Sequence, residues 1–182
     1  MKKLFTFLAA LLFLGATLVM SQPVPGKKFE LSTAISFTSF KISGDSNSES
    51  ILILPVRFGY YIWKGLEIEP ELALSKFSPG GHVDFNLSGN LAYNFKTSGE
   101  FVPFLLAGAG FGNGYAAGPV VSSGTDITAT LLNFGGGVKY VLGKMAAIRA
   151  EYRYTHNRLE KGSSLIQNLN LHQFFVGIAI FF

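Results

Sequence analysis

The chain ends on an alternating run, LNLHQFFVGIAIFF at residues 169–182. One set of alternate positions is large and apolar throughout: Phe174, Val176, Ile178, Ile180 and Phe182. A period of two is typical of a β-strand, because successive side chains in a strand point to opposite faces. In a soluble protein so apolar a strand would leave a sheet edge that promotes aggregation. The run therefore predicts a strand that pairs with the first strand of the chain and closes a barrel whose outer face meets lipid.

Seven further segments show the same alternation and are separated by turn-forming residues. Together they predict an all-β fold, an eight-stranded antiparallel up-and-down transmembrane β-barrel. The predicted strands are residues 28–42, 51–62, 66–77, 83–95, 101–113, 127–142, 146–157 and 169–182. Each is long enough to cross the hydrocarbon as a tilted strand of roughly 9–11 residues.

The connections between these segments alternate in length. Residues 63–65, 96–100 and 143–145 are short, residues 78–82 are intermediate, and residues 43–50, 114–126 and 158–168 are long and polar. Outer-membrane barrels have short periplasmic turns and longer external loops. We therefore expect both chain termini on the short-turn side and three long loops on the other.

Residues 1–21 are typical of a secretory signal peptide. Lys2 and Lys3 precede an apolar body that ends at Ser21, where small residues favour cleavage. The alternative is an N-terminal membrane anchor. Cleavage leaves 22–182 as the barrel, roughly 160 residues, which suits a single domain. The chain has no cysteine, which excludes a lipid-anchored cysteine, a disulfide framework and a thiolate metal site.

Composition favours a barrel over the other classes of membrane or soluble protein. The chain has 21 Gly and 18 Phe, but after residue 20 it has no apolar run long enough for a transmembrane helix. A soluble sandwich or lipocalin-like barrel also alternates, yet its water-facing positions carry many charges, whereas here charges are few and sign-balanced. Aromatic residues gather at both ends of the segments, as in the girdles of a membrane barrel. The net charge of +4 includes Lys2 and Lys3 and gives no support for a nucleic-acid partner.

The polar faces of the predicted strands carry charges that we expect to meet inside the barrel. A hairpin at residues 63–65 with Gly65 in the left-handed position pairs Arg57 with Glu71. The third and seventh strands lie opposite each other in an eight-strand ring. The bore of such a ring is about filled by its own side chains, so we expect a polar plug there instead of a catalytic carboxylate pair or an ion path. Its predicted members are Arg57, Glu67, Glu69, Glu71, Lys139, Arg149, Glu151 and Arg153.

Other chemically capable residues form no recognisable site. His82, His156 and His172 lack metal-ligand spacing, so no metal is expected. The glycine-rich run at residues 108–114 opens no helix and therefore cannot cradle a phosphate. No catalytic or cofactor-binding residue is predicted, and no cofactor is expected.

Residues 133–182 carry a resemblance to a known family. The stretches NFGGGVKYVL, IRAEYRYTH and LNLHQFFVGIAIFF, with FVPFLLAGAGFG at residues 101–112, resemble the small bacterial outer-membrane β-barrel superfamily that includes the OmpA-like transmembrane domain. The resemblance implies an outer-membrane location and mostly non-enzymatic roles in envelope stability, adhesion or surface exposure. It also implies that Gly177, Ile180 and Phe182 form a C-terminal assembly signal.

A second resemblance points to lipid A deacylase barrels, which carry a His and a Ser on the outer face of a late strand. His156 matches that His, but Arg158 stands where the Ser is required, which removes the nucleophile. We therefore predict a non-enzymatic barrel with a structural or surface-binding role through its external loops. A deacylase-like hydrolase using His156 and a small-solute or ion pore are the alternatives. The expected partners are outer-membrane lipid and lipopolysaccharide, the barrel-assembly machinery through the last strand, and an unidentified loop ligand.

Overall fold

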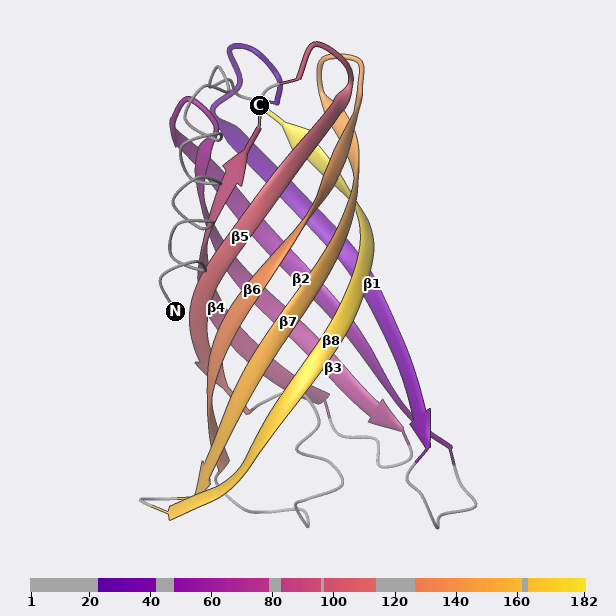
Figure 1. Ribbon diagram of the computed structural model, residues 1–182, viewed down its shortest axis with the longest axis vertical. Coiled ribbons are helices and arrows are strands. Elements are labelled where there is room, and N and C mark those ends of the chain that lie inside the picture. The colour runs from indigo at the N-terminus through magenta and orange to yellow at the C-terminus, as the bar shows by residue number, and fades with distance from the viewer. Residues whose placement is uncertain (1–22, 42–47, 79–82, 96, 114–126, 162–163) are drawn as a thin grey trace, which may run out of the picture.

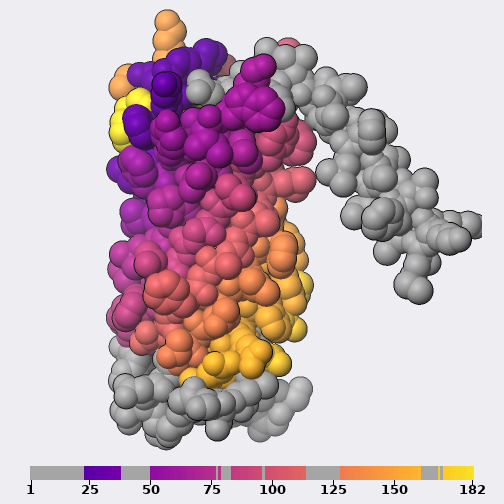
Figure 2. Space-filling view, turned by 90° about the vertical axis from the view of Figure 1, so that its left-hand side faces the viewer, coloured from indigo at the N-terminus to yellow at the C-terminus, as the bar shows by residue number. Residues whose placement is uncertain are grey.

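The computed structural model describes residues 23–41, 48–78, 83–95, 97–113, 127–161 and 164–182. Within these residues eight strands, each antiparallel to both neighbours, close into a barrel (Figure 1). The predicted fold class is thus confirmed, and Figure 2 shows successive strands as oblique bands around a cylindrical wall. The strands are β1 (Phe29–Lys41), β2 (Ser48–Trp63), β3 (Leu66–Ser78), β4 (Val83–Asn94), β5 (Phe101–Gly112), β6 (Ile127–Leu142), β7 (Ala146–Lys161) and β8 (Ser164–Phe181). No helix with the length and hydropathy needed to cross a membrane occurs among the described residues.

The two faces of the wall differ as the alternation predicts. On β8 the outward side chains of Phe174, Val176 and Ile178 are 72%, 58% and 56% exposed, whereas the inward Gln173 and Phe175 are each 2% exposed. The other strands repeat this division, with large apolar side chains outside. Such a surface is stable in lipid, where the closed sheet leaves no backbone group without a hydrogen-bond partner.

Pairing of β1 with β8 closes the barrel. Their register runs from Glu30 opposite Phe181 to Ile35 opposite Val176. Beyond it, the backbones of Phe29 and Phe182 exchange two hydrogen bonds of 3.0 Å. Over residues 176–180 the apolar last strand therefore has a partner strand on both sides.

Aromatic side chains lie toward both rims of the outer face. The rings of Phe29 and Phe182 stack at 5.8 Å near the short turns. Phe37 and Phe174, toward the opposite rim, are 65% and 72% exposed. Phe77 stands near the same end of β3, and its side chain lies outside the described part of the chain.

The hairpin between β2 and β3 differs from the prediction by one residue. Trp63, instead of Ile62, pairs with Leu66, and a bulge between Tyr61 and Trp63 restores the register. Gly65 adopts a φ of 95°, a conformation that favours glycine. Since the bulge absorbs the extra residue, Arg57 still lies opposite Glu71.

The predicted loop at residues 158–168 is wrong over most of its length. β7 continues to Lys161 and β8 begins at Ser164, so that Arg158 pairs with Asn168. The inward Leu159 is 1% exposed, while the outward Arg158 is polar and exposed. In a hydropathy pattern an outward polar residue resembles a loop residue, but here it lies in a strand that extends beyond the apolar part of the outer face. The predicted loops 43–50 and 78–82 fall largely outside the described residues, and 114–126 falls entirely outside them.

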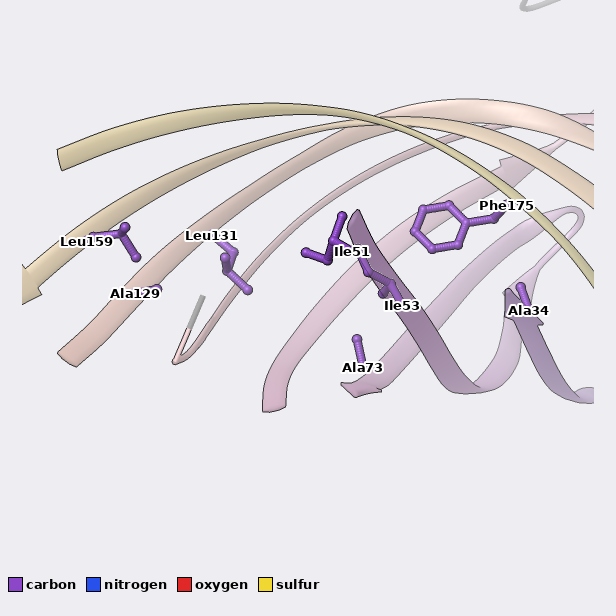
Figure 3. Packing of buried hydrophobic residues seen from close by; sticks show 8 residues of the cluster. All are labelled: Ala34, Ile51, Ile53, Ala73, Ala129, Leu131, Leu159 and Phe175. Carbon is purple, nitrogen blue, oxygen red and sulfur yellow. The ribbon is translucent and has the colours of Figure 1, made fainter. Parts of the chain in front are cut away.

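The described interior contains three apolar clusters, which the sequence prediction did not include: a small one of Ala92, Phe104 and Leu106, and two larger ones. The first lies toward the long connections and is called the loop-side cluster (Figure 3); its members are Ala34, Ile51, Ile53, Ala73, Ala129, Leu131, Leu159 and Phe175. The second lies toward the short turns and is called the turn-side cluster; its members are Val24, Tyr61, Val102, Val141, Ala147, Ala179 and Phe181. Each of the two larger clusters draws residues from several strands, so the bore is filled with apolar side chains on both sides of its middle.

Candidate functional site

The middle of the bore is filled by charged side chains, which we call the charged belt. They come from inward positions of β1, β2, β3, β6 and β7, and each is at most 3% exposed. The belt consists of Glu30, Arg57, Glu67, Glu69, Glu71, Lys139, Arg149, Glu151 and Arg153. The structure brings together all eight residues predicted to lie inside and adds Glu30, which the sequence analysis did not include.

On the loop side of the belt, Glu71 and Arg153 face each other across the bore. Arg153 donates to the two carboxylate oxygens of Glu71 at 2.7 and 2.9 Å. Arg57, next to Glu71 across the β2–β3 ladder, donates to it at 2.6 Å. Glu151 accepts from Arg153 at 2.8 Å and from Arg149 at 3.0 Å. This half of the belt therefore joins β2, β3 and β7 by charge-assisted hydrogen bonds, the strong class of such bonds.

On the turn side, Arg149 donates to both oxygens of Glu69 at 2.6 and 3.1 Å. The Lys139 ammonium lies between two carboxylates, 2.5 Å from Glu30 and 2.9 Å from Glu67. The Tyr61 hydroxyl donates to Glu30 at 2.5 Å. These contacts connect β6 to β1 and β3, which are not its neighbours in the wall.

Aromatic rings from both sides cover the cations of the belt. The guanidinium of Arg149 lies 4.4 Å from the ring centre of Phe104 on the turn side. Those of Arg153 and Arg57 lie 5.1 and 5.6 Å from the ring centre of Phe175 on the loop side. Cation–π attraction is strongest where the cation is desolvated, and these guanidinium groups are buried.

Residues 23–28, which we call the N-terminal strap, cross the turn-side mouth. A tight turn with Gly26 at a φ of 81° brings the Lys27 N–H to the Val24 carbonyl at 3.2 Å. The Val24 side chain is 5% exposed and belongs to the turn-side cluster. The strap also forms one wall of an open cavity of about 470 Å³, together with Glu100 and Lys144. Packing of the Val24 side chain in the turn-side cluster completes the apolar closure on this side.

The belt does not have the chemistry of a metal centre. Carboxylate oxygens of Glu30, Glu67 and Glu69 lie within 4.8 Å of one another. However, the ammonium of Lys139 already lies among them and provides the positive charge that a metal would supply. Among the histidines, His82 lies outside the described residues. Nδ1 of His172 lies 2.6 Å from the Tyr152 hydroxyl on the outer face, in hydrogen-bond contact.

His156 lies on the outer face of β7, as its parity predicted. Its Nδ1 is 2.7 Å from the amide oxygen of Asn170, which also accepts from the Tyr154 hydroxyl at 2.9 Å. Arg158, at the position where a deacylase would need its Ser, pairs with Glu160 at 2.6 Å. The outward side chains described on β7 and β8 include no serine, so none of them supplies the nucleophile of that chemistry.

The predicted assembly residues all lie in or beside the β1–β8 seam. Ile180 and Phe182 point outward and are 47% and 50% exposed. Gly177 points inward, and a Cβ placed on it would lie 2.0 Å from the backbone oxygen of Thr33. In the closed barrel residues 176–180 of this strand are paired with both β1 and β7.

Comparison with known proteins identifies the family. Residues 6–182 match the family described as outer membrane protein beta-barrel domain. The chain belongs to this family. It is a protein of the outer membrane. Small barrels of this family are typically non-enzymatic.

Two solved structures share the fold. Neisserial surface protein A (NspA) is 17% identical with a TM-score of 0.59, and the match covers 85% of this chain and 95% of that one. The N-terminal β-barrel domain of Pseudomonas aeruginosa OprF is 15% identical with a TM-score of 0.53, over 86% and 98% of the two chains. A search among curated proteins found no match. At these identities the structures support the barrel architecture alone.

Proposed function

We propose that this outer-membrane barrel is closed to solutes and non-enzymatic, and that it serves as a structural element and a rigid base for its external loops. The charged belt, held between the loop-side and turn-side clusters, is the observation that supports this proposal. A solute passing through the bore would have to displace Phe175 and break the forked pair between Arg153 and Glu71, which is 0% exposed on both side chains.

The belt also stiffens the barrel. Backbone ladders connect each strand only to its two neighbours. The pairs Glu69–Arg149 and Glu71–Arg153 connect β3 to β7 across the bore, and Lys139 connects β6 to β1. Cross-bore pairs resist flattening of the ring, which the ladders alone do not. A rigid ring holds the ends of the external connections at fixed separations.

The external side offers the surface for binding. Connections at residues 42–47, 79–82, 114–126 and 162–163 join the strands there, and the long β7–β8 hairpin carries polar outward side chains. His156, Asn170 and the Arg158–Glu160 pair lie at this end of the wall, where the polar head groups of outer-membrane lipid and lipopolysaccharide would meet them. We infer that surface contacts and lipid head-group contacts are made here.

Assembly is proposed to follow the usual route for such a protein. Residues 1–21 would direct export and be removed, and the barrel-assembly machinery would recognise β8 through Gly177, Ile180 and Phe182. Recognition would precede closure, because the backbone edge of β8 is occupied by β1 in the folded barrel.

Recordings across a planar lipid bilayer test the closed state. We expect no steady conductance from the folded protein, and channel activity from a variant in which Arg153, Glu71 and Phe175 are all replaced by alanine. A large steady conductance of the parent would overturn the proposal in favour of a pore.

Mass spectrometry of lipid A after incubation with the purified protein tests the absence of hydrolysis. We expect the same acyl content with the parent and with His156→Ala. Loss of an acyl chain that depends on His156 would show a deacylase instead.

A further inference from the structure

The charged belt holds one more acidic side chain than basic ones. Its acidic members are Glu30, Glu67, Glu69, Glu71 and Glu151. Its basic members are Arg57, Lys139, Arg149 and Arg153. With every group ionised, five negative charges oppose four positive ones, and the middle of the barrel carries a charge of −1.

The groups that carry this excess charge are buried, each at most 3% exposed. Apolar clusters lie on both sides of the belt, and lipid surrounds the wall outside. An ionised carboxylate without compensation is so unfavourable in such surroundings that the group takes the neutral form instead. One carboxyl group of the belt is therefore expected to hold a proton.

The hydrogen bonds single out Glu67. Glu69 and Glu71 each receive a forked arginine on both oxygens. Both oxygens of Glu151 face guanidinium groups as well. Glu30 accepts from Lys139, Tyr61 and Arg149.

Only one of the two carboxylate oxygens of Glu67 accepts hydrogen bonds. Its Oε2 accepts from the Lys139 ammonium at 2.9 Å and from the Asn94 amide at 3.0 Å. Its Oε1 is buried and has no hydrogen-bond partner. That oxygen packs against Gly59, where an added Cβ would lie 1.9 Å from it.

The neighbours of Glu67 favour a proton over a metal ion. Polar and charged groups face it from β1 (Glu30), β2 (Tyr61), β4 (Asn94), β6 (Lys139) and β7 (Arg149), and Glu69 lies on its own strand. Lys139 already occupies the position between the carboxylates. A divalent ion would change the belt from −1 to +1, whereas one proton makes it neutral.

We propose that Glu67 is a buried proton-binding site. At neutral pH its carboxyl group is protonated on Oε1, while Oε2 accepts the hydrogen bonds from Lys139 and Asn94. The proton is taken up from water on folding and returned to water on dissociation, and no other bond changes. The inference rests on the sealed interior of the proposed function, but its readouts are independent of conductance.

The test compares Glu67→Gln with Glu69→Gln, because both remove one potential negative charge from the same strand and face. Glutamine reproduces the shape of a protonated glutamate, so we expect Glu67→Gln to keep or raise the urea midpoint in detergent micelles. Glu69→Gln removes half of a forked ion pair, and we expect it to lower the midpoint. We also expect the parent to lose stability relative to Glu67→Gln as the pH rises from neutral, because dissociation restores the uncompensated charge.

Infrared spectroscopy supplies a readout taken directly on the folded parent. The folded parent is expected to show the carbonyl stretch of a protonated carboxylic acid, shifted in D₂O and absent from Glu67→Gln. Absence of that band from the parent at neutral pH would overturn the proposal. So would a parent midpoint that rises with NaCl or MgCl₂, but not with choline chloride, when Glu67→Gln shows no such dependence, because a metal cation would then balance the belt.

Discussion

Replacing Arg153 by methionine should destabilise the barrel strongly. The guanidinium donates to Glu71 at 2.7 and 2.9 Å and to Glu151 at 2.8 Å, with no exposed surface on the side chain. Methionine has the bulk to fill much of the space over Phe175, so the main effect is electrostatic. Removing one partner of a buried ion pair costs about 3–5 kcal/mol, because the remaining charge stays desolvated. With a urea dependence of about 2 kcal/mol per molar, the unfolding midpoint should fall by about 1.5–2.5 M.

Arg158→Met is the matched control, since it removes an arginine from the same strand on the opposite face. Its ion pair with Glu160 has the arginine side chain 57% exposed, and an exposed pair contributes at most about 1 kcal/mol. The double variant Arg153→Met with Glu71→Gln keeps the excess of one acidic group and should recover much of the loss. Urea titrations in lipid vesicles, followed by tryptophan fluorescence of Trp63, measure all three. Equal midpoints for Arg153→Met and Arg158→Met would refute the reasoning and show that the belt is hydrated.

Three further substitutions test the wall, its closure and its mouth. Gly177→Val should block pairing of β1 with β8, since a Cβ there would lie 2.0 Å from the Thr33 backbone oxygen. The folded, heat-modifiable band of this variant should then disappear from an unboiled gel. Gly89→Ala, which has open space around the added Cβ, should keep that band. Ile178→Arg puts a charge on the lipid-facing side of β8 and should lower the free energy of unfolding in vesicles by about 2–4 kcal/mol if that position is near the bilayer midplane; no change would place this residue away from lipid. Val24→Asp should release the N-terminal strap and speed proteolysis before β1, and unchanged cleavage would show that the strap is held by other contacts.

The sequence predicted the wall better than the interior. Lipid selects large apolar side chains at every second position, so the faces of Leu54, Val56 and Ile178 were readable from the alternation alone. The opposition of β3 and β7 followed from the strand count, and it placed Glu69 and Glu71 opposite arginines on β7.

The apolar clusters were not readable in this way. At Ile51 and Ile53 both parities of the strand are apolar, and only the fold shows that these two side chains point inward, where they are 2% and 1% exposed. An inward position in the bore accepts an apolar side chain beside other apolar side chains, or a polar side chain beside hydrogen-bond partners. The partner of Glu30 was missed for a similar reason, because Lys139 lies 109 residues away in the chain and the pairing depends on the shape of the closed ring.

The seam between β1 and β8 constrains how this wall can be built. One row of backbone N–H and C=O groups on β1 stays unpaired until β8 pairs with it. Hydrocarbon offers those groups no water, and each one left bare there costs several kcal/mol. A half-built sheet is therefore unfavourable in the bilayer, and we expect insertion and ring closure to be coupled.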